Sequence, residues 1–320
     1  MITEKGHVHV AHKRQRTPTK IYYEKYGSGP ERVLFVMGLS APCQAWDFQA
    51  KFLAQTGKYT SILFDNRGNG HSDSPLGLYT TSQLAADALD LLDEVGWTSQ
   101  VHLVGISMGG MISLEMVDAD RARFQSLTLT STSARRFLPT WTAVSTFAKI
   151  ALYYREPRDQ INAVMKLVYP EVWLDQAPAD PTHAQKHETN REMAIMNFIT
   201  HMGQSRLQPL HGNAGQVSAV FRHHFSDARL LKLRRSGLPI LVVTGTHDNL
   251  VPPASSFHLK RMLQPRRFEL FEGSGHDIPE EQTERYNIVL LEHLASSSSS
   301  PSIPATAPTI TPTLPREAKL

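Results

Sequence analysis

The sequence predicts an α/β fold in which helices cover both faces of a mostly parallel central sheet. Short apolar runs of strand length alternate with segments whose apolar residues recur at helical spacing. No two-residue hairpin turn joins these runs, so crossover connections between parallel strands are expected. A Gly-Ile-Ser-Met-Gly segment at residues 105–109 also lies between a predicted strand and a predicted helix.

Length and charge limit the function classes. The chain has 320 residues, of which 41% are hydrophobic, so it can bury a large core. With 33 Lys and Arg against 30 Asp and Glu, the net charge of +3 does not favour a nucleic-acid or membrane-surface binder. One cysteine excludes an internal disulfide, and no apolar run reaches the ~18 residues of a membrane span. We therefore expect a soluble, intracellular protein.

The first 132 residues follow the strand–helix alternation in order. Residues 1–30 predict two edge strands joined by a basic turn. Buried strands are predicted at 33–37, 61–64, 101–104 and 124–130. Gly57 and Gly96 end the two helices that are predicted between the first three of these strands. Gly38, Asp65 and Ser107 each end one of these strands, at the sheet edge where parallel α/β proteins bind ligands.

The strand pattern disappears between residues 133 and 235. Aromatic residues and methionines are spread over helix-like, polar sequence that prolines break into short pieces. We interpret 133–235 as a helical cap inserted into a core formed by residues 1–132 and 236–295. Its apolar side chains either line an adaptable pocket or pack as ordinary core, and packing is the better assumption for any single residue.

The alternation resumes after this segment and then stops. Strands are predicted at 238–244 and 268–271, and helices at 255–263 and 280–294. Residues 296–320, which are rich in Ser, Pro and Thr, have little apolar bulk to bury and predict a disordered tail.

Ser107 has the setting of a nucleophile. Only glycine fits a sharp strand-to-helix turn on either side of it, so the hydroxyl would project from the strand tip. The Met108 N–H at the helix start would then favour an oxyanion. A glycine-rich turn with a capping serine fits the same residues equally well, so the distinction depends on a later acid and histidine.

Two later loops, each at the end of a predicted strand, supply this acid and histidine. Asp248 lies in the loop 245–253 and His276 in the loop 272–281. A hydroxyl needs a base, a histidine can accept and return its proton, and a carboxylate can hold the imidazole. For Asp248 the alternative is a turn-capping aspartate, with Asp277 as a rival carboxylate beside the histidine.

Together with residues 65–72, these stretches resemble the α/β-hydrolase superfamily over about residues 20–295. The resemblance implies the catalytic residues Ser107, Asp248 and His276, in that order. It also implies an oxyanion hole made by the backbone N–H groups of Leu39 and Met108, although relatives commonly carry His where this chain has Met37. Residues 65–72 match a structural turn of the family, and neither Asp65 nor Arg67 is assigned a catalytic role.

Other sites are not supported by the sequence. We predict no cofactor and no metal site, since His183 and His187 lack an evident third ligand. Cys43 is interpreted as a packed small residue. Epoxide hydrolases and haloalkane dehalogenases use aspartate at the position of Ser107, which argues against those reactions.

The predicted function is a serine hydrolase that cleaves an ester, lactone or thioester through an acyl-enzyme. Alternatives on the same triad are carbon–carbon bond or amide hydrolysis and cofactor-free peroxidation, and a third is a non-enzymatic ligand receptor of this fold. The expected partner is a small-molecule substrate, an apolar acyl ester. The ending Ala318-Lys319-Leu320 resembles a peroxisomal address, which predicts an import receptor as a second partner and a peroxisomal, otherwise cytoplasmic, location.

Overall fold

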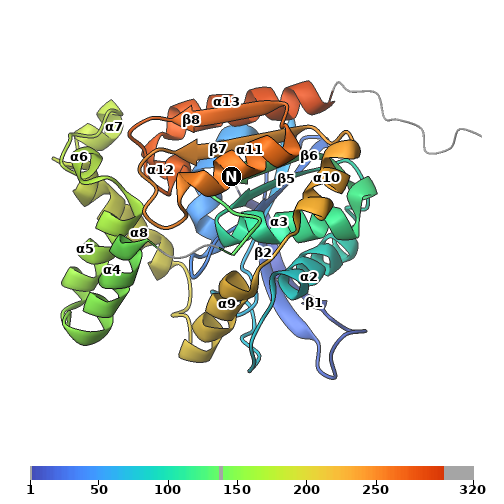
Figure 1. Ribbon diagram of the computed structural model, residues 1–320, viewed down its shortest axis with the longest axis horizontal. Coiled ribbons are helices and arrows are strands. Elements are labelled where there is room, and N and C mark those ends of the chain that lie inside the picture. The colour runs from blue at the N-terminus through green and yellow to red at the C-terminus, as the bar shows by residue number, and fades with distance from the viewer. Residues whose placement is uncertain (1, 137–139, 299–320) are drawn as a thin grey trace, which may run out of the picture.

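The computed structural model describes residues 2–136 and 140–298 (Figure 1). Its strands are β1 Ile2–Val10, β2 Thr19–Tyr26, β3 Glu31–Val36, β4 Tyr59–Phe64, β5 Val101–Ile106, β6 Phe124–Thr130, β7 Ile240–Gly245 and β8 Arg267–Phe271. They form one eight-stranded sheet in the order β1-β2-β4-β3-β5-β6-β7-β8. β2 is antiparallel to β1 and β4, whereas all pairs from β4-β3 to β7-β8 are parallel. The predicted α/β fold with a mostly parallel sheet is confirmed.

Helices cover both faces of this sheet because alternate strand residues point to opposite sides. Leu34 and Val36 pack in one core cluster with α2, α3, α10 and α11, and Val33 and Phe35 pack in the other with α1 and α13. These helices are α1 Asp47–Gln55, α2 Thr81–Glu94, α3 Met108–Ala119, α10 Asp227–Arg235, α11 Pro253–Leu263 and α13 Thr283–Ser298. Short 3-10 turns at Cys43–Trp46 and Arg121–Arg123 precede α1 and β6.

The elements described between β6 and β7 are all helical. Besides α10 they are α4 Trp141–Leu152, α5 Pro157–Val168, α6 Glu171–Leu174, α7 Pro181–Ala184, α8 Asn190–Gly203 and α9 Leu210–Arg222. Prolines divide this segment as expected: Pro157 and Pro181 begin their helices, and Pro170 and Pro209 are N-caps. Figure 1 shows α4 to α8 gathered at one end of the molecule.

Two kinds of packing occur within this helical segment. Met165, Tyr169 and Leu174 form a small separate cluster with Ala194. In contrast, α9 and α10 contribute Ala219 and Leu230, among other residues, to the main core beneath the sheet. The division into core and cap at residues 133 and 235 remains a prediction.

The C-terminal part differs from its prediction in detail. Non-helical Gln282 splits the expected helix 280–294 into α12 (Ile278–Glu281) and α13. α13 continues to Ser298, so it includes the first residues assigned to the tail. Residues 299–320, including the predicted address Ala318-Lys319-Leu320, lie outside the described residues. None of the helices in the described part is long and apolar enough to cross a membrane.

The strand register brings the expected loops to one edge of the sheet. Val36 is opposite Gly105 in the β3–β5 pair, and Ile106 is opposite Thr130 in the β5–β6 pair. Further along, β7 and β8 end together. The loops that follow these five strands therefore leave the sheet side by side.

Candidate active site

Ser107 occupies a strained turn between β5 and α3. Its φ of 55° and ψ of −124° lie in a region that non-glycine residues rarely adopt, at a cost of about 1–3 kcal/mol. The Ser107 N–H donates to the Thr130 carbonyl at 2.9 Å, and the Thr132 hydroxyl donates to the Ser107 carbonyl at 2.7 Å. Both backbone groups of Ser107 are thus held, one by the last residue of β6 and one by Thr132 just beyond it, which offsets the strain.

The glycines around Ser107 are required by close backbone contacts. A Cβ at Gly105 would lie 2.5 Å from the Gly109 carbonyl oxygen, and one at Gly109 would lie 2.0 Å from the Val36 carbonyl oxygen. No side chain fits at either distance. The start of α3 therefore lies directly against the loop that follows β3.

Gly109→Ala is expected to push α3 away from this loop. Overpacking of this kind costs about 1–3 kcal/mol, and a displacement of about 1 Å at a reacting group lowers activity about 10²-fold. Thermal unfolding and ester turnover would measure both effects. Gly203→Ala is the control, because a Cβ on this residue of α8 meets open space. Equal activity and stability in the two variants would contradict the tight turn.

Asp248 and His276 meet where β7 and β8 end. The Nδ1 atom of His276 lies 2.8 Å from Asp248 Oδ2. Asp248 Oδ1 accepts the N–H groups of Leu250 and Val251, each at 2.8 Å. Asp248 is therefore both the imidazole partner and the turn-capping aspartate that the sequence offered as an alternative. Both side chains are buried.

The pKa of His276 reflects opposing effects. Burial alone would lower it, but the charge of Asp248, its hydrogen bond and the charge of Asp277 together outweigh burial. The net pKa lies above the usual histidine value. The His276 imidazole is therefore mostly neutral, and able to accept a proton, only at a pH above this raised pKa.

The backbone around His276 is held by both the core and the helical segment. The His276 N–H donates to the Val168 carbonyl at the end of α5 (2.8 Å). The Glu281 carboxylate accepts the Gly275 N–H at 2.7 Å, and the Ser131 hydroxyl donates to the His276 carbonyl at 2.8 Å. The adjacent residues Ser131 and Thr132 thus connect the backbones of His276 and Ser107. This role was not predicted, because a Ser-Thr pair after a strand is not a specific sequence pattern.

The backbone N–H groups of Leu39 and Met108 are the predicted oxyanion donors. Neither donates to another group within the described residues. Their segments are adjacent, since a Cβ at Gly38 would lie 3.1 Å from Ser107 Cβ. The Met37 carbonyl accepts the Asn66 amide at 2.9 Å, so a hydrogen bond holds the loop at this point although Met37 replaces the usual histidine.

Two further carboxyl groups lie beside His276 and were not predicted as a pair. Asp277 accepts the Tyr169 hydroxyl at 3.3 Å, and Glu280 accepts the Asn197 amide at 3.0 Å. Burial raises the pKa of both, and repulsion from Asp277 helps to bring that of Glu280 to about 7. These partners come from α8 and the residue after α5, so the helical segment completes the surroundings of the histidine.

Asp277→Asn is expected to move the acid limb of the kcat/KM profile to lower pH. Asp277 stabilises the imidazolium, so its removal lowers the pKa of His276, and the neutral base then persists at lower pH. A pH–rate profile measures the shift. Glu272→Gln, which removes an exposed carboxylate of the same loop, should leave the limb in place. An unmoved or raised limb in Asp277→Asn would contradict this assignment.

The other candidate positions show no reactive site. Cys43 is buried, and desolvation raises the pKa of its thiol. His183 and His187 stack with ring centroids 6.5 Å apart. Across residues 2–136 and 140–298, no three His, Cys, Asp or Glu side chains are grouped closely enough to hold a metal ion.

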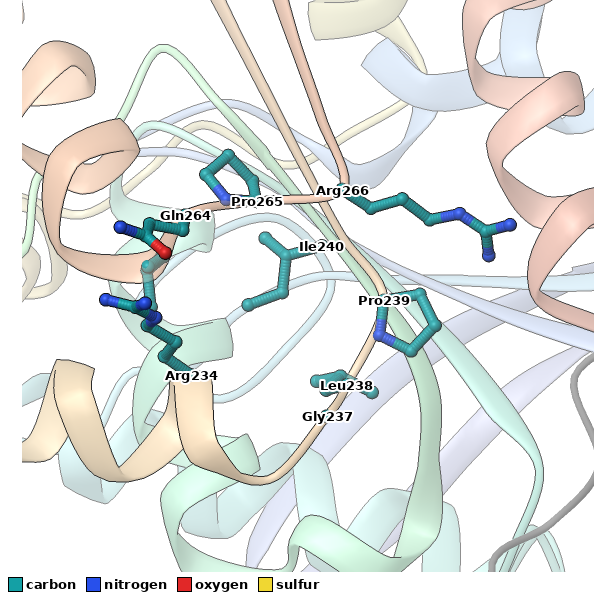
Figure 2. A pocket seen from close by; sticks show the side chains of 9 residues that line it. Arg234, Gly237, Leu238, Pro239, Ile240, Gln264, Pro265 and Arg266 are labelled. Carbon is teal, nitrogen blue, oxygen red and sulfur yellow. The ribbon is translucent and has the colours of Figure 1, made fainter.

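A hollow of about 450 Å³ lies at the other end of β7 (Figure 2). Arg234, Leu238, Ile240 and Arg266 are among its lining residues. Ile240 is the first residue of β7, whereas Asp248 follows its last residue. The hollow is therefore on the opposite edge of the sheet from Asp248 and His276.

Comparisons with known proteins agree with this fold. Residues 31–283 match the family model described as alpha/beta hydrolase fold. A protein of Variovorax paradoxus (strain S110) assigned as the carbamate hydrolase RutD is 28% identical over 89% of this chain and 99% of its own. 3-Oxoadipate enol-lactonase 1 of Acinetobacter baylyi (strain ATCC 33305 / BD413 / ADP1) is 25% identical over 81% and 88%. The fold of a thermophilic esterase from Thermogutta terrifontis superposes with a TM-score of 0.70, at 22% identity over 91% and 99%.

Proposed function

Because the chain belongs to the alpha/beta-hydrolase fold family, we propose that it is a serine hydrolase that cleaves an ester, lactone or thioester of a small molecule. The observation that carries this proposal is the 2.8 Å contact between His276 Nδ1 and Asp248 Oδ2 at the sheet edge where Ser107 ends β5. That contact directs Nε2, the atom that would receive a proton, away from Asp248.

The first half of the reaction forms an acyl-enzyme. Ser107 Oγ attacks the substrate carbonyl carbon while His276 Nε2 takes its proton, and the carbonyl oxygen becomes an oxyanion. The Leu39 and Met108 N–H groups donate to that oxyanion. The tetrahedral intermediate then expels the alcohol or thiol, which receives the proton from His276.

The second half releases the acid. Water attacks the acyl carbon as His276 takes one of its protons, and a second tetrahedral intermediate expels Ser107 Oγ, which regains the proton. Asp248 remains ionised and stabilises the imidazolium in both halves. The sum is one ester bond and one water converted to an acid and an alcohol.

An apolar acyl group is the substrate part that the helical segment supports best. Thr140 donates to the carbonyl of Asn249, the neighbour of Asp248, so α4 begins beside the triad. Trp141 and Phe147 of this helix are 82% and 52% exposed. Exposed aromatic side chains on a helix that begins at this point suit an apolar ligand.

A carbamate or amide is the second candidate bond. The similarity to the carbamate hydrolase favours it, as the similarity to the enol-lactonase favours the ester class. Both bonds react on one triad, because each has a carbonyl carbon and a leaving group that needs a proton.

Substrate series with p-nitrophenyl leaving groups test this proposal. Acyl esters from acetate to dodecanoate are compared with p-nitrophenyl N-alkyl carbamates and with acyl p-nitroanilides. We expect turnover to be highest for esters, to have an optimum chain length and to be unaffected by Cys43→Ala. A preference for carbamates would establish the second candidate, and no turnover of any series by the folded protein would contradict a hydrolase.

A further inference from the structure

Helix α9 lies in backbone contact with the turn that follows β4. A Cβ at Gly212 would lie 2.3 Å from the Gly68 carbonyl oxygen, and one at Gly215 would lie 2.5 Å from the Tyr79 ring. The Gln208 amide also donates to the Gly68 carbonyl at 2.9 Å. The two glycines therefore let α9 come closer to the core than any other residues would allow.

This approach places the side-chain amide of Gln216 between two core segments. Its Oε1 atom accepts the Ser40 N–H at 3.0 Å, and its Nε2 atom donates to the Arg67 carbonyl at 2.9 Å. A second donor, the Gln208 amide, lies 3.2 Å from the same Oε1. Gln216 is 0% exposed. Because an N–H only donates and a carbonyl only accepts, these partners fix the orientation of the amide.

The segment that Gln216 binds carries the predicted oxyanion donor. The Leu39 N–H belongs to the peptide unit between Gly38 and Leu39, and the units on either side are both anchored. On one side the Met37 carbonyl accepts the Asn66 amide, and on the other the Ser40 N–H donates to Gln216. Each of these two planar peptide units is held at one atom and so cannot turn freely. The peptide unit between them, which carries the Leu39 N–H, is therefore held at both ends.

The loop needs an anchor at this point. Ser40 has a φ of 59°, which costs a non-glycine residue about 1–3 kcal/mol unless its surroundings hold it. The Asn213 amide of α9 binds the Ser40 hydroxyl at 2.8 Å. At the other end of the bridge, two hydrogen bonds of 2.6 and 2.8 Å to buried Asp87 fix Arg67. Gln216 therefore ties a strained loop to a rigid part of the core.

We propose that Gln216 is a positioning residue for the oxyanion hole. It keeps the Leu39 N–H directed toward the developing oxyanion, and it makes this arrangement depend on the docking of α9. The inference rests on the proposed hydrolase function. Helix α9 thereby takes part in transition-state stabilisation, although it carries none of Ser107, Asp248 and His276.

Gln216→Met tests this role, because methionine has a similar length and no hydrogen-bonding amide. We expect kcat to fall about 10–10²-fold, with KM changed less than about threefold. Removal of a whole oxyanion donor lowers kcat about 10²–10³-fold, and this variant displaces the Leu39 N–H without removing it, so a smaller loss is expected. An alkylboronic acid, whose tetrahedral adduct places an oxygen in the hole, should bind more weakly in proportion to kcat/KM.

Gln125→Met is the matched control for loss of a glutamine. The Gln125 amide binds Glu31 and His102 beside the first residues of β6, far from the oxyanion loop along the strand. This variant should keep wild-type kcat and boronate affinity. If Gln216→Met is folded and keeps both within about twofold, or if it raises KM alone, the positioning role is overturned.

Gln216→Glu keeps the inference testable if Gln216→Met does not fold. A protonated carboxyl has one acceptor and one donor, as the amide has, but an ionised carboxylate cannot donate to the Arg67 carbonyl. The kcat of this variant should therefore fall with rising pH and show an alkaline limb that wild type lacks. A profile identical to wild type overturns the role of Gln216 alone. Absence of turnover of every substrate series by folded wild type overturns the proposed function and this inference with it.

Discussion

Ser107→Ala is expected to lower kcat by about 10⁴–10⁶-fold while the protein remains folded. The variant removes one oxygen atom from a partly exposed side chain, and the backbone bonds from Ser107 N–H to Thr130 and from Thr132 to the Ser107 carbonyl persist. The proposed oxyanion hole of Leu39 and Met108 is also unchanged in this variant, so a residual rate over water is expected. Hydrolysis of the best p-nitrophenyl ester, together with thermal unfolding, measures both parts.

The double variant Ser107→Ala/His276→Ala sharpens this result. If the two residues act as one unit, its kcat should equal that of Ser107→Ala and not fall by the product of the single losses. Multiplicative losses, or activity of Ser107→Ala near that of wild type, would show that the serine is not the nucleophile.

Asp248→Asn is expected to lower kcat by about 10⁴-fold at neutral pH. Oδ1 accepts two backbone N–H groups, so an asparagine would keep its oxygen there and direct its NH₂ toward His276 Nδ1. Two donors would then face one another unless the ring proton moves to Nε2. That tautomer cannot accept the proton of Ser107, and the reaction loses its base.

Asp277→Asn is the matched control for Asp248→Asn. It removes a carboxylate beside the same histidine, but Asp277 bonds to Tyr169 and not to the imidazole. We expect nearly full kcat at its optimum pH. A loss in Asp277→Asn larger than the loss in Asp248→Asn would make Asp277 the acid of the triad.

The sequence predicted the sheet because the features involved are local. A buried parallel strand is an apolar run, and the turn at Ser107 requires glycines that stand beside it in the chain. The prolines that start α5 and α7 act within one helical turn. The break at Gln282 was missed, because that position has no proline or glycine to mark it.

The hydrogen bonds that hold the candidate site could not be predicted, since they join residues that are far apart in the sequence. Gln216 is 176 positions from Ser40, and Ser131 is 145 positions from His276. An amphipathic pattern shows that a helix such as α9 packs, but it does not show against which loop. Asp277 and Glu280 could be read as neighbours of the histidine, whereas their raised pKa values follow from burial under α8 and the end of α5.

Labelling with a fluorescent fluorophosphonate is the direct test for an activated serine at Ser107. Wild type, Ser107→Ala and His276→Ala are treated side by side, and intact mass locates the adduct. We expect one adduct on Ser107 in wild type, none in Ser107→Ala and strongly slowed labelling in His276→Ala. Folded wild type that is not labelled, or Ser107→Ala that is labelled as fast as wild type, would contradict an activated Ser107 and favour a ligand receptor of this fold.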